Sequence, residues 1–96
     1  MNIRFIGIDG LGKHEVNRIF SKLTDFDFIK SVEIIEFNNS CGEVIYDVNI
    51  EIKPVHGDVS IHIFDNYIYM VDCCCGCMNE AVIHIDRSAY ERLEII

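Results

Sequence analysis

The segment Glu43–Lys53 alternates apolar and polar side chains, and this constrains the fold more than any other feature of the chain. A period of two is typical of a β-strand that buries one face and exposes the other. Pro54 has no N–H to donate to a strand ladder, so the strand ends there. The apolar face needs a second layer to cover it. That face carries Val44, Tyr46, Val48, Ile50 and Ile52, whereas Asp47, Asn49, Glu51 and Lys53 share the other.

The segment Lys13–Thr24 can supply this layer, because its apolar side chains recur at helical spacing. Val16, Ile19, Phe20 and Leu23 form a single apolar stripe, and polar residues cover the other side. This pattern predicts a helix that lies on a sheet.

Strand-like segments rich in Ile, Val and Phe make up most of the remaining chain. Val59–Phe64 and Tyr67–Cys75 predict either a fourth strand or a tight hairpin. The last ten residues fit two interpretations, a final helix through Leu93 or a closing strand Glu91–Ile96. The other predicted strands are Asn2–Ile8, Phe28–Phe37 and Ala81–Ile85.

The predicted order is a strand, a helix and then consecutive strands with short turns, which favours antiparallel pairing. One helix covers part of one sheet face. We therefore expect residues 1–96 to form a single α+β domain, a two-layer sandwich of a mainly antiparallel sheet and one major helix. Ile34-Ile35 and Tyr67–Val71 carry apolar side chains toward both faces. This pattern predicts a homodimer or larger assembly through the sheet.

The charge balance bears on the class of partner. Eight Lys and Arg residues stand against 16 Asp and Glu residues, which gives a net charge of −8. Direct nucleic-acid binding is disfavoured, because phosphate contacts need clustered Lys and Arg. We find no leader pattern and no apolar run of about 20 residues, so we expect no membrane span. Five cysteines without a leader predict a reducing, cytoplasmic location.

Four of the five cysteines are clustered in Cys73–Cys77. Cys74 and Cys77 form a Cys-x-x-Cys pair, which makes zinc or iron binding, or thiol-redox chemistry, one interpretation. On a strand, Cys73 and Cys75 would face one side and Cys74 the other. The pattern therefore favours small apolar side chains at the end of a buried strand and no bound cofactor.

Ser60, His62 and Asp72 invite comparison with a hydrolase triad. Ser60 and His62 are two residues apart and share one strand face. That spacing does not place a hydroxyl against an imidazole as a triad requires, and the chain has no Gly-x-Ser-x-Gly turn. We therefore disfavour a hydrolase and expect a polar face.

Val59-Ser60-Ile61-His62, followed by Tyr69, Asp72 and Cys75-Gly76, resembles the central motif of prokaryotic S-adenosylmethionine decarboxylase proenzymes. That family carries Glu-Ser-His-Leu-Ser/Thr-Ile-His, then a Pro-Glu turn, a Tyr, an Asp and Thr-Cys-Gly. The rest of the chain is similar in layout only. The resemblance implies the decarboxylase-like fold, with His62 at the position of the histidine that assists processing. Cys75 or Cys77 corresponds to the proton-donating cysteine.

The resemblance also implies lost chemistry. In the family, self-cleavage turns the serine into a pyruvoyl group that binds the substrate amine. Here Gly57 stands at the position of that serine and His56 at the position of the glutamate. Glycine has no oxygen to start the acyl shift, so we expect no pyruvoyl group and favour a non-enzymatic protein.

These observations predict a small binding protein that has lost self-processing. We expect it to bind a small adenosyl-type ligand or a protein partner. The candidate residues are Ser60, His62, Asp72, Cys75 and Cys77. The compact acidic chain would suit a phage or mobile-element inhibitor of a host component. A metal-binding or thiol-redox protein that uses Cys74 and Cys77 is the alternative.

Overall fold

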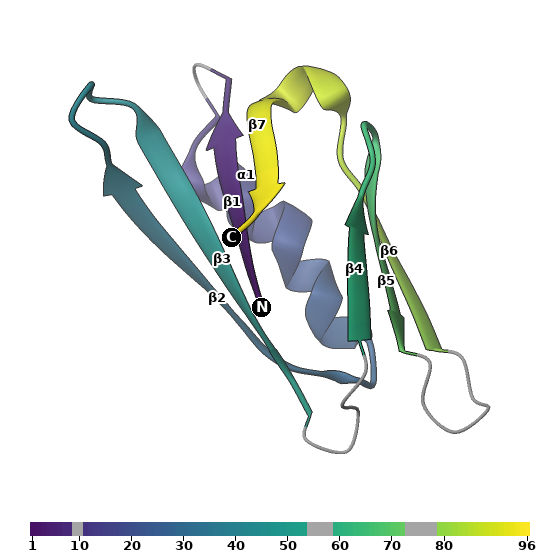
Figure 1. Cartoon of the computed structure of the whole chain (residues 1–96). Helices are drawn as coiled ribbons and strands as arrows, with labels where there is room; N and C mark the ends of the chain where they lie inside the picture. Colours follow the sequence, from purple (N-terminus) through teal and green to yellow (C-terminus); the bar gives the residue numbers. More distant parts are fainter. Residues whose placement is uncertain (9–10, 54–58, 73–78) are drawn as a thin grey trace.

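Two antiparallel sheets and one α-helix make up the described residues, 1–8, 11–53, 59–72 and 79–96 of a computed structural model (Figure 1). In chain order, the elements are β1 (Asn2–Gly7), α1 (Lys13–Phe20), the 3-10 helix η1 (Ser21–Asp25), β2 (Ile29–Asn38), β3 (Val44–Ile52), β4 (Val59–Ile63), β5 (Tyr67–Asp72), β6 (Asn79–His84), the 3-10 helix η2 (Arg87–Ala89) and β7 (Tyr90–Ile95).

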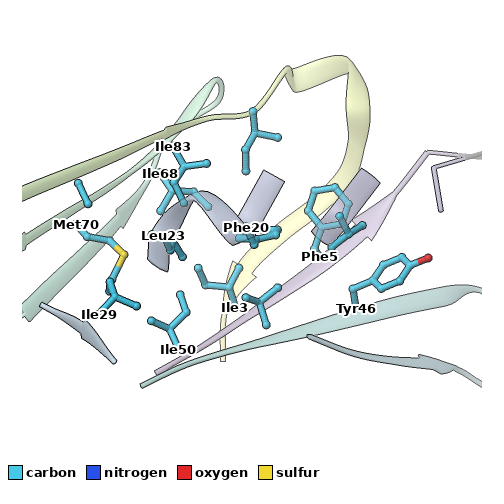
Figure 2. Packing of buried hydrophobic residues seen from close by; sticks show 14 of the residues in the cluster. Ile3, Phe5, Phe20, Leu23, Ile29, Tyr46, Ile50, Ile68, Met70 and Ile83 are labelled. Atoms are coloured by element: carbon cyan, nitrogen blue, oxygen red, sulfur yellow. The ribbon is translucent and has the colours of Figure 1, made fainter. Parts of the chain in front are cut away.

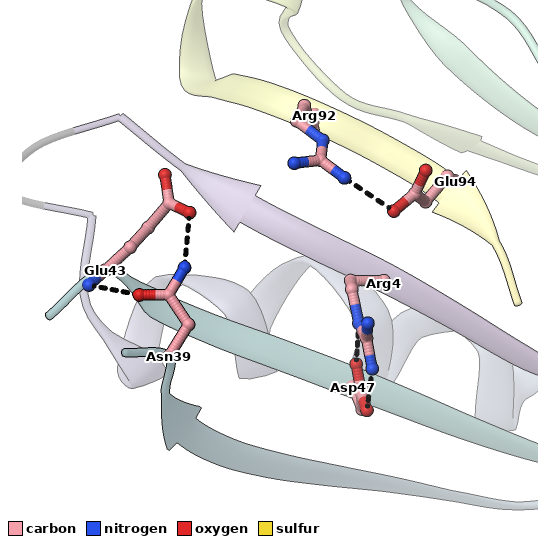
Figure 3. Close-up of polar contacts among 6 residues, drawn as sticks. All are labelled: Arg4, Asn39, Glu43, Asp47, Arg92 and Glu94. Carbon is pink, nitrogen blue, oxygen red and sulfur yellow. Dashed lines mark hydrogen bonds and ion pairs between the residues drawn. The ribbon is translucent and has the colours of Figure 1, made fainter. Parts of the chain in front are cut away.

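The four-stranded sheet has the strand order β2-β3-β1-β7. Its inner strand β1 pairs antiparallel with β3, where Arg4 lies opposite Asp47. On its other side β1 pairs with β7, where Ile3 lies opposite Ile95. Alternation along β1 places Ile3 and Phe5 in the core and Arg4 on the outer face. The Arg4 guanidinium donates to both Asp47 carboxylate oxygens, at 2.9 and 3.0 Å (Figure 3).

The three-stranded sheet is an antiparallel meander with the order β4-β5-β6. Ile68 and Met70 of β5, with Ala81 and Ile83 of β6, point into the core. The turn between β4 and β5 is tied to the chain that leaves β6, because the Ile85 N–H donates to the Asn66 carbonyl at 2.9 Å.

One core joins the helix to both sheets (Figure 2). Val16, Phe20 and Leu23 are fully buried, as the helical stripe predicts. The Phe20 ring meets the edge of the Phe5 ring, with ring centroids 5.9 Å apart and an interplanar angle of 83°. Ile68 and Ile83 belong to the same cluster, so α1 and η1 lie between the two sheets.

The α+β class and the antiparallel pairing are confirmed, but the expected single sheet is wrong. The strands of the described residues form two sheets, and the helix packs against both. Alternation within a strand says which face is buried but not which strands share a ladder.

The helical segment also differs from the prediction. The α-helix ends at Phe20, and η1 continues to Asp25. Hydroxyl groups compete for the carbonyls at this end, since Thr24 Oγ1 donates to the Ser21 carbonyl at 2.7 Å. Among the described residues, no helix has the length and apolar character needed to cross a membrane.

The tail follows the strand interpretation. β7 pairs with β1, so Leu93 lies opposite Phe5 and packs against the core. The helix through Leu93 does not form, and the 3-10 helix η2 is confined to Arg87–Ala89. The Asp86 carboxylate begins that turn by accepting from the Ser88 N–H at 3.0 Å.

Candidate functional site

Ser60 and His62 lie where their spacing predicts, together on the outer face of the three-stranded sheet. Both side chains are exposed, whereas their neighbours Val59, Ile61 and Ile63 pack against the core. The face continues on β5 and β6. We call it the ring face and define it as Ser60, His62, Phe64, Tyr67, Tyr69, Glu80, Val82 and His84.

Asp72 does not join them. It pairs across the ladder with Val59, so its side chain lies on the opposite face from Ser60. Asp72 is fully buried, whereas Ser60 and His62 are exposed. The geometry therefore cannot form a Ser-His-Asp triad.

Aromatic rings give the ring face its character. Phe64 stacks on Tyr67 with ring centroids 4.7 Å apart and an interplanar angle of 22°. His84 lies opposite Tyr67, and their ring centroids are 6.4 Å apart. His62 lies opposite Tyr69 at 6.2 Å. Rings from three strands thus make one exposed surface.

The cysteine predictions fall mostly outside the described residues. Gly57, Cys74, Cys75 and Cys77 all lie in undescribed segments. Cys41 is exposed in the turn between β2 and β3. Within the described ranges, no group of three or more His, Cys, Asp or Glu side chains is arranged to hold a metal ion.

A groove of about 370 Å³ lies between the end of β4 and β7. Both strands are edge strands of their sheets, and they are not paired with one another. Side chains from both strands line the groove. Figure 1 shows β4 and β7 at the edges of the two sheets that face each other. We call it the edge groove; its lining residues are Ile63, Phe64, Asp65, Arg87, Tyr90, Glu91, Arg92, Leu93 and Glu94.

Tyr90 holds one end of the edge groove together. Its hydroxyl donates to the Asp65 carbonyl at 2.6 Å, which links the first residue of β7 to the turn after β4. The Arg87 guanidinium lies 4.6 Å from the Tyr90 ring centroid and donates to the Tyr90 carbonyl at 2.7 Å. The turn that carries Arg87 is fixed by Asp86. The Ser88 N–H donates to that carboxylate and holds its pKa below the ordinary value.

Charges of both signs line the groove. Arg92 forms an ion pair with Glu94 at 3.0 Å (Figure 3), and Glu91 lies between Tyr90 and Arg92 in the sequence. The groove can therefore offer apolar contact, strand-edge hydrogen bonds and both kinds of ionic partner.

Sequence reasoning missed the edge groove, although two of its candidates, Ser60 and His62, lie on the adjoining ring face. Phe64 is the residue that the groove and the ring face share. The strand interpretation of the tail was the available signal, because it makes residues 91–96 a sheet edge. Nothing in the sequence indicates that β4 lies beside that edge.

Comparisons of the chain with protein-family models, curated proteins and solved structures find no match.

Proposed function

We propose that the protein is a non-enzymatic binding protein that holds an adenosyl-type ligand in the edge groove. In this proposal the scaffold is decarboxylase-like and has lost self-processing at Gly57. The edge groove carries the proposal, because it is a concave site between two strand edges with aromatic, apolar and charged walls. Small-ligand sites are typically concave and lined by apolar groups with a few polar ones.

An adenine ring matches the borders of the groove. An edge strand presents backbone N–H and C=O groups that have no partner in its own sheet. Adenine offers a donating amine and accepting ring nitrogens along one edge, so it can pair with such groups. Phe64 lines the groove with a side chain that is 46 % exposed, and a base stacked on an aromatic ring gains about 1–3 kcal/mol.

The charges suit the rest of such a ligand. Asp65, Glu91 and Glu94 provide carboxylates for the sulfonium and ammonium groups of S-adenosylmethionine, and Arg87 and Arg92 can face its carboxylate. Because the groove lining has more carboxylates than guanidinium groups, it favours a ligand with a net positive charge.

The expected affinity is modest. A drug-sized ligand gains about 0.3 kcal/mol per non-hydrogen atom, so one with about 25 such atoms reaches a Kd of a few micromolar at best. An open groove will bind more weakly. The titration therefore extends into the millimolar range.

We expect S-adenosylmethionine to bind the purified protein and to shift backbone amide resonances of β4 and β7. Calorimetry measures the affinity, and nitrogen-edited NMR locates the site. Phe64→Ala should weaken binding by about fivefold or more, since it removes roughly 1 kcal/mol of stacking. Phe37→Ala is the matched control, because Phe37 is 36 % exposed on the outer face of the four-stranded sheet.

Three outcomes would contradict the proposal. One is the absence of heat and of resonance shifts at millimolar ligand. Another is shifts confined to β2 and β3. The third is equal weakening by Phe64→Ala and Phe37→Ala. Adenosine and methionine, titrated separately, tell whether the base or the amino-acid part carries the affinity.

The loss of self-processing has its own test. We expect intact mass spectrometry of purified protein to give one uncleaved chain, because Gly57 offers no hydroxyl to start the acyl shift. Two fragments divided before Ser60 would overturn this part of the proposal, whatever the ligand titration shows.

A further inference from the structure

We infer that the ring face is the contact surface of a homodimer in which two copies of this chain stack sheet against sheet. The inference does not rest on the proposed ligand, although Phe64 belongs both to the edge groove and to this face. Its occupant is a second copy of the same chain.

The ring face exposes large apolar and aromatic side chains. Phe64 is 46 % exposed, Val82 is 40 % exposed and Tyr67 is 36 % exposed. Phe64 directly follows β4, and Tyr67 and Val82 lie on the adjacent strands β5 and β6, so the three form one surface. Tyrosine is also enriched in protein interfaces.

The low charge of the ring face allows two copies of the chain to meet there. The chain has a net charge of −8, so most pairings of two copies bring carboxylates together. The ring face, as defined by its described residues, holds one carboxylate, Glu80, which accepts from the Tyr69 hydroxyl at 2.8 Å. The outer face of the four-stranded sheet instead carries ion pairs such as Arg4 with Asp47. The ring face is thus a nearly neutral surface on an acidic protein.

The strand register makes the ring face complementary to itself. Two sheets that stack face to face keep their strands roughly aligned. A twofold axis along β5 places β4 of each copy over β6 of the other. The Ser60 hydroxyl then faces the Glu80 carboxylate of the second copy, and the Phe64 ring faces the His84 ring. Each of these contacts forms twice.

The size of the face sets the strength of the dimer. Three strands about 4.8 Å apart and five or six residues long cover about 250 Å², well below the roughly 800 Å² per partner of a standard interface. We therefore expect a weak dimer, with a Kd of about 10–500 µM. Dilute solutions will contain monomers.

Sedimentation equilibrium over a wide concentration range tests the dimer, with no ligand added. We expect the wild-type chain to pass from monomer to dimer as its concentration rises. Val82→Asp should weaken the dimer by tenfold or more, because each copy then carries into the contact a carboxylate that loses its water there. Ile35→Asp is the matched control: Ile35 is 50 % exposed on the outer face of the four-stranded sheet, and the dimer should keep its Kd. Circular dichroism verifies that both variants fold.

A gain of affinity tests the geometry. Ser60→Lys should tighten the dimer several-fold by placing an ammonium against Glu80 of the second copy, and adding Glu80→Gln should remove that gain. A monomer at every concentration would overturn the inference, as would a dimer that Ile35→Asp weakens and Val82→Asp does not. A dimer that Ser60→Lys leaves unchanged would contradict the twofold axis along β5.

Discussion

Phe20→Ala is expected to lower the free energy of unfolding by about 3–5 kcal/mol, the usual cost of truncating a buried phenylalanine. Phe20 is fully buried at the end of α1, between the two sheets. Its ring packs against Phe5 of β1 in an edge-to-face pair, which adds to the burial term. Domains of this size are stable by about 5–15 kcal/mol, so the variant should retain little reserve.

Guanidinium unfolding followed by circular dichroism measures this effect. Phe37→Ala is the control, because it makes the same chemical change on an exposed ring. We expect it to cost less than about 1 kcal/mol, as surface substitutions usually do. Equal losses for the two variants would show that Phe20 does not sit in a core shared by both sheets.

The sequence predicts well what depends on local periodicity. Val16, Phe20 and Leu23 are buried because a helical stripe needs only neighbouring residues to be recognised. The same holds for Tyr46, Val48 and Ile50, which fall on the core side of β3. Ser60 and His62 share a face for the same reason.

Strand pairing was not predictable in this way. The contact of Ile3 with Ile95 joins the two ends of the chain, and no local pattern encodes it. The division into two sheets follows from such long-range pairing. The edge groove depends on that division, since it lies where β4 and β7, each paired within its own sheet, are not paired with one another.

The position of Asp72 shows that the pairing register of β4 with β5 determines which side chains share a face. A shift of one residue in the pairing of β4 with β5 would carry its side chain to the other face. The observed pairing with Val59 turns Asp72 into the core, away from Ser60. Residue type and spacing made these residues candidates, but the ladder separates them.

Tyr90 connects the stability of the fold to the proposed site, and Tyr90→Ala is expected to cost about 3–5 kcal/mol. Its side chain is buried, and its ring lies 6.0 Å from that of Phe5. Its hydroxyl also donates to the Asp65 carbonyl at 2.6 Å, so the residue ties the four-stranded sheet to the turn between β4 and β5. Removing the side chain should leave a cavity at this junction and open the end of the edge groove.

Tyr90→Phe separates the two roles. It keeps the ring and loses only the hydrogen bond, so we expect a loss of about 0.5–1.5 kcal/mol in unfolding free energy. Amide hydrogen exchange should then be faster at Ile85, whose N–H donates to the Asn66 carbonyl where the β4–β5 turn meets the chain after β6. Faster exchange confined to α1 would contradict this role, as would a loss with Tyr90→Phe as large as that with Tyr90→Ala.

Tyr90→Phe should also weaken S-adenosylmethionine binding if the edge groove is the site, because Phe64 adjoins the β4–β5 turn. Dimer formation through the ring face, which contains Val82, should change less. Tyr90→Phe thus distinguishes the edge groove, whose shape depends on Tyr90, from the ring face, which does not contain this residue.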